Sequence, residues 1–333
     1  MLIDEPVSED LDLPTPRRRR RLLTVALALA TLGVAGLVAC RLAGFDSPTP
    51  LAQLVSFVPY GVPVAGFLAL LAGILRRWRT ALIALLAGAV LTGLITPRMV
   101  GGDAPAPSDG VRLRVMTVNL LQGDATADLI ALLRTERPDL LSVQELTPEA
   151  ATRLERAGIT DLLPHVALRA APGVAGTGLY GRAEFSDAAT LYQGSRFDMA
   201  RARYVHNGVA MDVVAVHPSP PIPGPGGAVR AWRLELERLP EAAPDDGVVS
   251  LLAGDFNATL DHVALRELVD SGYVDAADAV GDGLTPTWQA SLIPPVTIDH
   301  ILVEEGIGVR AVRVHDVGRS DHRAVVADLV VPG

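Results

Sequence analysis

Lysine is absent from this 333-residue chain, so arginine supplies every fixed positive charge. The 29 arginines are outnumbered by 38 acidic residues, which gives a formal net charge of -9. Proteins that bind long nucleic acids through the phosphates present many basic side chains, so this balance disfavours a generic duplex-DNA binder. Cysteine is almost absent too. Cys40 is the single one and lies in an uncharged apolar run, which excludes an intrachain disulfide and leaves the C-terminal two thirds without thiol chemistry.

Charge and hydropathy divide the chain into two unequal parts. Residues 1–100 contain ten arginines against six acidic residues, whereas residues 101–333 contain nineteen against thirty-two. The first part also holds three uncharged apolar runs, at 22–40, 51–75 and 80–96. At about 1.5 Å per residue, runs of this length approach or exceed the ~30 Å hydrocarbon core of a bilayer. They predict three transmembrane helices in a multi-pass integral protein of the cytoplasmic (plasma) membrane; the alternative is a set of buried core helices.

The arginines that border these runs predict their orientation. Arg17–Arg21 precede the first run, and a second arginine group at 76–79 separates the second run from the third. Because positive charge favours the cytoplasmic side, residues 1–21 are expected to form a cytoplasmic Arg-rich tail. Three crossings from there place the remainder outside the cytoplasm. Residues 97–110, rich in Gly, Pro and Ala, are predicted to be a flexible linker.

A different interpretation of the first run stays open. The residues Leu37-Val38-Ala39-Cys40 resemble a bacterial lipoprotein cleavage box that follows an Arg-rich leader, and Cys40 would then become a lipidated N-terminus. Arg41 directly after the cysteine argues against this alternative. Both interpretations leave the C-terminal part outside the cytoplasm.

From residue 111 to residue 331, short apolar strands alternate with helical segments. Most of the expected strands run into polar side chains where they end, which is typical of a functional site at one edge of a sheet. These polar groups are Asn119, Gln144-Glu145, His217-Pro218, Gly254-Asp255-Phe256-Asn257, Asp299-His300 and Ser320-Asp321-His322.

This ordered set, together with Thr287-Trp288, resembles the motifs of the endonuclease/exonuclease/phosphatase superfamily over roughly residues 111–331. The resemblance implies an α+β fold: a four-layer α/β/β/α sandwich of two mixed β-sheets, here preceded by the three transmembrane helices. It also implies a catalytic domain at 111–331 that hydrolyses phosphoesters.

Three residues are expected to bind the metal. Glu145 and Asn119 offer a carboxylate and an amide carbonyl, hard oxygen ligands that suit Mg²⁺ or Mn²⁺. The resemblance makes Glu145 the main ligand and Asp321 an additional ligand of the metal or of a water.

Five residues are expected to carry the catalysis. Asp255 and Asn257 lie two apart and share one face of an extended segment; the resemblance assigns Asp255 to the nucleophilic water and Asn257 to the phosphate or the metal. Asp299 is expected to orient His322 and to favour its charged form. His217 is implied to be a second histidine that faces the phosphate.

These features predict a membrane-anchored, Mg²⁺- or Mn²⁺-dependent phosphoester hydrolase, with its catalytic domain outside the cytoplasm. The substrate class stays open among a lipid headgroup, a nucleotide and a nucleic acid, and no protein partner is implied. The alternative is a catalytically silent, membrane-held binding or sensor module of the same fold. A small transporter is disfavoured because the three apolar runs contain no internal charge.

Overall fold

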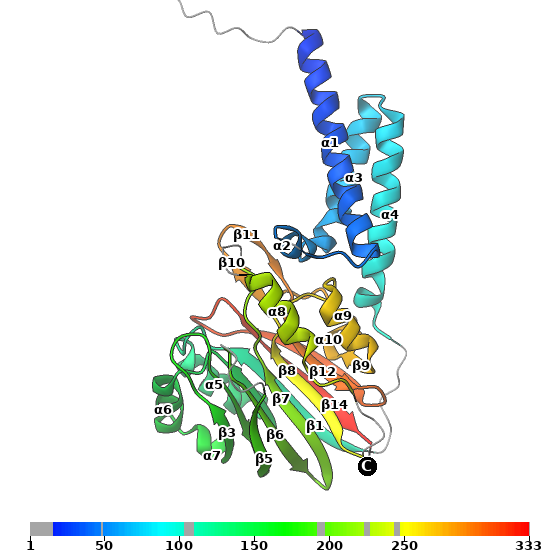
Figure 1. Ribbon diagram of the computed structural model, residues 1–333. Coiled ribbons are helices and arrows are strands. Elements are labelled where there is room, and N and C mark those ends of the chain that lie inside the picture. The colour runs from blue at the N-terminus through cyan, green and yellow to red at the C-terminus, as the bar shows by residue number, and fades with distance from the viewer. Residues whose placement is uncertain are drawn as a thin grey trace, which may run out of the picture.

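The computed structural model describes residues 16–47, 49–102, 110–191, 197–222, 227–242 and 247–332. A bundle of three helices stands on one end of a larger domain built from two β-sheets (Figure 1). The bundle consists of α1 (Pro16–Leu42), α3 (Gly61–Ile74) and α4 (Trp78–Val100).

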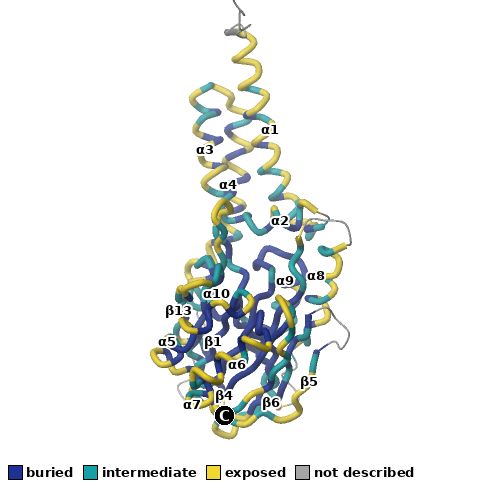
Figure 2. The backbone as a smooth tube through the Cα atoms, turned by 90° about the vertical axis from the view of Figure 1, so that its left-hand side faces the viewer, coloured by how far each residue is buried: buried dark blue, intermediate teal, exposed yellow. Residues whose placement is uncertain are grey.

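Small side chains let the three helices approach one another. Ala65 and Ala72 of α3 are fully buried, and so are Ala84 and Leu91 of α4 to within one per cent. The outer faces of the bundle are exposed and apolar, as the exposed outer positions of the helices in Figure 2 show. Within the described chain, two helices, Arg17–Leu42 and Trp78–Val100, are long and apolar enough to cross a membrane, judged by length and composition alone.

The run at 51–75 differs from the predicted single span. It is divided into α2 (Leu51–Val55), a 3₁₀ helix η1 (Val58–Tyr60) and α3. The 14 residues of α3 rise only about 21 Å. Pro59 lies in the first turn of η1, where the missing backbone N–H of proline costs no hydrogen bond. Helix α2, which precedes it, is separate from the three-helix bundle. The expected three spans are therefore two long helices and a shorter one.

The predicted tail and linker also differ from the structure where it describes them. Helix α1 already begins at residue 16, whereas residues 1–15 lie outside the described part. Helix α4 continues through the first residues of the expected linker 97–110, and Gly102 N donates a hydrogen bond to Ala279 O at 3.1 Å. Residues 103–109 are outside the described residues.

Two six-stranded sheets form the larger domain. The first has the order β13-β14-β1-β2-β4-β3, with β1 (Val111–Asn119), β2 (Leu140–Gln144), β3 (His165–Arg169), β4 (Thr177–Gly181), β13 (Gly308–Asp316) and β14 (Arg323–Val331). The second has the order β5-β6-β7-β8-β12-β9, with β5 (Phe185–Leu191), β6 (Met199–His206), β7 (Val209–Val216), β8 (Val249–Asp255), β9 (Tyr273–Asp275) and β12 (Asp299–Glu304). Among the strands that the structure describes, β1–β2 and β7–β8 pair in parallel and the other pairs are antiparallel, so both sheets are mixed, as predicted.

Alternating side chains of each strand fill two different layers. Val115 of β1 and Leu251 of β8 belong to the core between the sheets, whereas their neighbours Met116 and Leu252 face helices on the outside. The helices that cover the first sheet are α5 (Thr126–Glu136), α6 (Pro148–Arg156) and α7 (Ile159–Leu162), and those that cover the second are α8 (Ala228–Glu237) and α9 (Val263–Asp270). This arrangement is the α/β/β/α sandwich expected from the sequence.

Two further elements lie at the end of the domain that faces the bundle. Helix α10 (Ala276–Ala279) packs there, and a two-stranded hairpin of β10 (Trp288–Ala290) and β11 (Ile293–Val296) projects beside α2 (Figure 1).

Buried ion pairs fix the bundle on the sandwich. Asp261, in the loop before α9, accepts hydrogen bonds from Arg41 Nε at 2.8 Å and from Arg98 Nη1 at 2.8 Å, and all three side chains are buried. Burial favours the neutral carboxyl group, but the two guanidinium groups outweigh it and hold the pKa of Asp261 below its usual value. The sandwich is thus docked on the helices rather than held only by a tether.

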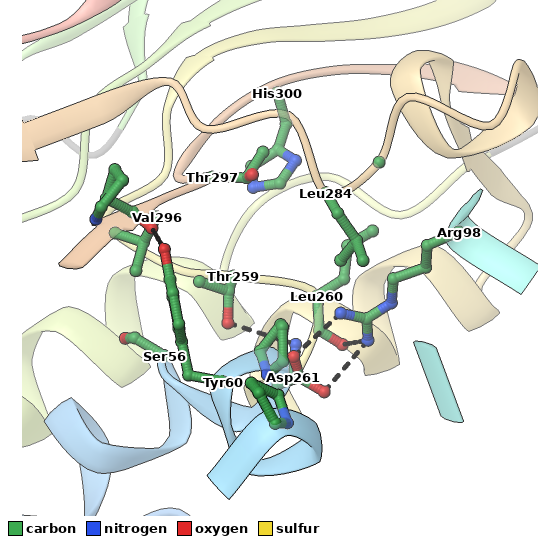
Figure 3. A pocket seen from close by; sticks show the side chains of 14 residues that line it. Ser56, Tyr60, Arg98, Thr259, Leu260, Asp261, Leu284, Val296, Thr297 and His300 are labelled. Atoms are coloured by element: carbon green, nitrogen blue, oxygen red, sulfur yellow. Dashed lines mark hydrogen bonds and ion pairs between the residues drawn. The ribbon is translucent and has the colours of Figure 1, made fainter. Parts of the chain in front are cut away.

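The junction also contains neutral hydrogen bonds around a cavity of about 310 Å³. Figure 3 shows Arg98 directed at Asp261, with Tyr60 across the cavity, and the Tyr60 hydroxyl donates to Pro295 O at 2.7 Å. Nδ1 of His262 accepts from Thr259 N at 2.9 Å, so its Nε2 donates to the carbonyl of Ala52, 2.8 Å away. These contacts hold residues 51–60 against the sandwich.

Candidate active site

The two parallel strand pairs bring polar residues to one edge of the sandwich. Asn119 ends β1 and Glu145 follows its parallel neighbour β2, while His217 follows β7 and Asp255 ends the parallel strand β8. The carboxyl ends of parallel strands lie at the same edge. Asp299 begins β12, which is antiparallel to β8, and pairs directly with Asp255.

A glycine allows the strands of the second sheet to meet closely beside this site. Gly254 pairs with Val216, and a Cβ atom at position 254 would collide with the Val216 carbonyl oxygen. The glycine that precedes Asp255 is therefore required by the pairing of β7 with β8.

His322 lies between two carboxylates at the centre of the site. Its Nδ1 is 2.9 Å from Asp299 Oδ2, and its Nε2 is 3.7 Å from Asp255 Oδ2. Burial of the ring opposes its charged form, but the negative charges of Asp299 and Asp255 outweigh burial and raise the pKa of His322 to about 10. At neutral pH the ring is an imidazolium whose two nitrogens both carry protons.

Asp255 is buried and faces several partners. Its Oδ1 accepts a hydrogen bond from Asn257 N at 2.8 Å, and its Oδ2 accepts one from Asn119 Nδ2 at 3.2 Å. Burial raises the pKa of Asp255, the charge of His322 lowers it, and the net shift is upward. Such a carboxylate is a stronger base than an exposed aspartate.

His217 has the opposite protonation preference from His322. It is buried, and its Nε2 lies 3.6 Å from Asp255 Oδ2, beyond hydrogen-bond distance. Burial lowers the pKa of His217 to about 4, so the ring is neutral at pH 7. Its Nδ1 has no hydrogen-bond partner within the described part of the chain.

Asn119 and Glu145 are joined in the structure, but differently from expectation. Asn119 Nδ2 donates to Glu145 Oε1 at 3.2 Å, whereas its Oδ1 accepts from Leu121 N at 3.0 Å. The backbone donor fixes this amide orientation. Asn119 therefore presents its NH₂ group to Glu145 and Asp255, and its oxygen is not turned toward them as the predicted metal ligand would be.

Glu145 is held in a strained backbone conformation. Its φ is 54°, and Leu121, Gln122 and Asn257 at the same site also have positive φ values of 48°, 54° and 50°. Glu145 Oε2 accepts from Gln122 N at 2.8 Å. Burial is the main cause that raises the pKa of Glu145.

Asp321 has one free carboxylate oxygen. Its Oδ2 accepts from Trp288 Nε1 at 3.0 Å, while its buried Oδ1 has no hydrogen-bond partner among the residues described. Asn257 completes the set, because its Nδ2 donates to Pro218 O at 3.0 Å at the same cleft. All eight predicted site residues are thus gathered at one edge of the sandwich.

Two groups of residues that contain carboxylates are candidates for a metal site, and one of them suits a metal. Asp255, Asp299 and His322 have ligand atoms within 4.8 Å of one another. A protonated imidazole has no lone pair for a metal, however, so this trio is better described as a carboxylate–imidazolium–carboxylate chain. Glu145 and Asp321, with the free Oδ1 of Asp321, offer hard oxygen ligands and fit a divalent cation.

Supporting hydroxyl groups had no assigned role in the sequence analysis. Thr287 Oγ1 accepts from the backbone N–H groups of Ile298 and Asp299 at 3.0 Å, which fixes the start of β12. Ser320 Oγ donates to Asn119 O at 2.8 Å and accepts from His322 N at 3.1 Å. Both residues belong to motifs quoted in the sequence analysis, and only their membership of those motifs could have predicted a role for them.

A cleft of about 520 Å³ lies over these residues. Its floor includes Glu145, Asp255 and His322, and one wall is formed by Gln53, Ser56 and Phe57 from the segment between α1 and α3. This wall was not anticipated, because residues 51–75 were expected to lie in the membrane. The polar residues Gln53 and Ser56 within that apolar run were the sequence feature that could have indicated contact with the sandwich.

Comparison with known proteins identifies the same fold. A sequence profile of the Endonuclease/Exonuclease/phosphatase family matches residues 116–322. Similar solved structures include TDP2 from D. rerio complexed with single strand DNA product (14% identity, TM-score 0.53, covering 66% of this chain and 99% of that chain). Others are the endonuclease/exonuclease/phosphatase from Beutenbergia cavernae DSM 12333 (21%, TM-score 0.51, 67% and 72%) and an AP endonuclease from Archaeoglobus fulgidus (17%, TM-score 0.50, 65% and 98%). At these identities the likeness shows the fold alone, and no curated protein matches the chain.

Proposed function

The chain belongs to the endonuclease/exonuclease/phosphatase family, and from that premise we propose that it is a membrane-anchored, divalent-metal-dependent phosphoester hydrolase. The observation that carries the proposal is the buried carboxylate–imidazolium–carboxylate arrangement of Asp255, His322 and Asp299, of which Asp255 and His322 line an open cleft. Together these three side chains provide a carboxylate of raised pKa, which can act as a base, and an imidazolium, which can stabilise the negative charge of a phosphoester during hydrolysis.

Each residue has a role that follows from its geometry. Asp255, with its raised pKa, orients the nucleophilic water and accepts its proton. His322 is charged and donates a hydrogen bond to a phosphate oxygen, while Asp299 orients its ring. His217, which is neutral at pH 7, lines the cleft beside Asp255 as the second histidine that faces the substrate, and Asn257 also lines the cleft.

A divalent cation is required on electrostatic grounds. Four carboxylates (Glu145, Asp255, Asp299 and Asp321) surround one imidazolium, and no arginine lines the cleft within the described residues. A phosphate would be repelled from this site without a further positive charge. We assign Glu145 and Asp321 to hold Mg²⁺ or Mn²⁺, with Asn119 orienting Glu145. Such an ion, when bound, supplies charge neutralisation and stabilises the leaving oxygen.

The membrane part of the proposal rests on the bundle. Its outer face is apolar all round, which suits lipid better than water. Arg17–Arg21 at the start of α1 and the arginines of the turn between α3 and α4 lie at the same end of the bundle, the end away from the catalytic domain (Figure 1). With the positive-inside rule, this arrangement supports a catalytic domain outside the cytoplasm.

The proposed activity can be tested on the full-length chain in detergent. We expect hydrolysis of a nitrophenyl phosphomonoester or phosphodiester with Mg²⁺ or Mn²⁺. Asp255→Asn should lower the rate by about 10² to 10⁴, the range for loss of a general base. Asp316→Asn, at an exposed carboxylate in a surface ion pair, is the matched control and should leave the rate unchanged. Equal rates for wild type and Asp255→Asn would refute the proposal.

A further inference from the structure

The active-site cleft is closed on one side by the segment that joins α1 to α3. Gln53, Ser56 and Phe57 of this segment line the cleft together with the catalytic side chains. The Gln53 side chain donates to the Pro221 carbonyl, and Tyr60 donates to Pro295 O at 2.7 Å, so the segment is attached both to the loop after β7 and to the β10–β11 hairpin. The site is therefore built jointly by the helical part and the sandwich.

The cleft is polar on its floor and apolar towards its mouth. The carboxylates and imidazoles described above form the floor, whereas Phe57, Ile222 and Ile293 lie on the walls. Ile222 is 62% exposed and Ile293 is 44% exposed, and the adjacent Leu292 at the tip of the β10–β11 hairpin is 95% exposed. Large apolar side chains gathered at a cleft mouth indicate a surface that binds an apolar partner.

The charges of the cleft argue against a polynucleotide in this position. Single-stranded nucleic acids are held by a basic groove that follows the backbone, together with aromatic rings on which bases stack. Within the described residues the cleft has no arginine in its lining, and the chain has no lysine. A ligand with one phosphate and an apolar extension matches the cleft better.

The β10–β11 hairpin, which contributes Ile293 to the cleft, and the neighbouring α2 lie at the end of the sandwich where α1 and α4 terminate (Figure 1). The pairs of Asp261 with Arg41 and Arg98 are buried, and they fix this end of the domain against the helices. If α1 and α4 cross a bilayer, the part of the cleft formed by α2 and the β10–β11 hairpin lies next to the surface of that same bilayer.

On the basis of the proposed function, we propose that the substrate is a phosphoester with an apolar tail, taken from the bilayer in which the chain is anchored. The tail lies along Phe57, Ile222 and Ile293, and the phosphate lies over Asp255 and His322. Residues 53–57, which form one wall of the cleft, thereby contribute to substrate specificity.

Two nitrophenyl phosphodiesters that differ only in the tail test this proposal on the full-length chain in mixed micelles. Hexadecyl 4-nitrophenyl phosphate carries the tail, and ethyl 4-nitrophenyl phosphate lacks it, with the same leaving group. We expect kcat/KM to be higher for the hexadecyl ester. Phe57→Ser and Ile222→Ser should each reduce the hexadecyl-to-ethyl ratio about ten- to hundredfold, mainly through KM, as expected for one lost apolar contact surface.

Val166→Ser is the matched control, because Val166 is an exposed apolar residue on β3, outside the cleft; it should change neither rate. An unchanged ratio in both cleft variants, or equal loss on both esters, would overturn the tail-binding role while leaving the hydrolase proposal intact. Faster cleavage of a single-stranded oligothymidylate than of the hexadecyl ester would overturn it in favour of nucleic acid. Failure to cleave any ester with Mg²⁺ or Mn²⁺ would overturn the proposed function as well.

Discussion

Removal of the Asp299 carboxylate charge should lower the pKa of His322 and weaken its preference for the charged form. The pKa of His322 is raised from 6.5 to about 10, and each unit corresponds to about 1.4 kcal/mol, so its surroundings favour the charged ring by on the order of 5 kcal/mol. Asp299, at 2.9 Å, is nearer than Asp255 at 3.7 Å and contributes most of this preference. Asp299→Asn should therefore lower the pKa of His322 by well over one unit.

The sign of the pH dependence follows from this shift. Because the pKa of His322 is raised in the folded protein, its charge stabilises the fold fully below about pH 6.5, and the contribution is lost as the pH rises through about 10. Activity that needs the imidazolium should therefore persist to about pH 9 in the wild type. In Asp299→Asn the alkaline limit of activity should move towards neutral pH.

Two measurements examine this prediction. Carbon-13 labelling of histidine Cε1 allows the His322 ring to be titrated by NMR in metal-free, full-length protein, and pH–rate profiles report the alkaline limit. Asp275→Asn is the matched control, since Asp275 forms another buried aspartate–histidine pair, with His300 at 2.7 Å, apart from Asp255, His322 and Asp299. It should shift the titration of His300 and leave the alkaline limit of activity in place.

A double mutant adds a test of coupling. If Asp299 acts only through His322, Asp299→Asn combined with His322→Ala should resemble the worse single mutant. Losses that multiply, an unchanged His322 titration in Asp299→Asn, or unfolding of either single mutant would refute the reasoning and assign these residues to structure alone.

Three further predictions concern the fold and its orientation. Asp261→Asn leaves two buried arginines without their carboxylate and should destabilise the protein by about 3 to 5 kcal/mol, measured by thermal unfolding against Asp316→Asn, which should stay near the wild type. Gly254→Ala forces β7 from β8 and should lower both melting temperature and activity; a variant with wild-type stability would contradict the close strand contact. Alkaline phosphatase fused after Gly110 should be active. Green fluorescent protein fused at the same position should stay dark, because it is exported unfolded. The reverse pattern would place the catalytic domain in the cytoplasm.

Much of the sandwich could be predicted because its signals are local. The strands that were expected to run into Asn119 and Gln144-Glu145 are β1 and β2, which end at Asn119 and Gln144, since buried apolar runs are interrupted by the polar residues of the site. Parallel pairing then accounts for the meeting of Asn119 with Glu145. The amide orientation of Asn119 was not predictable, because it depends on a hydrogen bond from the backbone of Leu121.

The junction between bundle and sandwich was not predictable for a related reason. An apolar run such as 51–75 has the same hydropathy whether it faces lipid or packs on protein, as Ala52 does in the core beneath α8 and α9. The partner of Arg98 lies 163 residues away in the sequence, and no local pattern indicates that pairing. The opposite protonation of His217 and His322 likewise depends on burial and on neighbours that only the fold supplies.

The most direct test of the account is the metal dependence of phosphoester hydrolysis by the full-length chain. After removal of divalent ions with EDTA, we predict that activity is lost and that it returns with added Mg²⁺ or Mn²⁺. Glu145→Gln should need more Mg²⁺ than the wild type and should be partly rescued at high concentrations, because one anionic ligand is lost. Full activity in EDTA would contradict the metal site at Glu145 and Asp321, and with it the proposed mechanism.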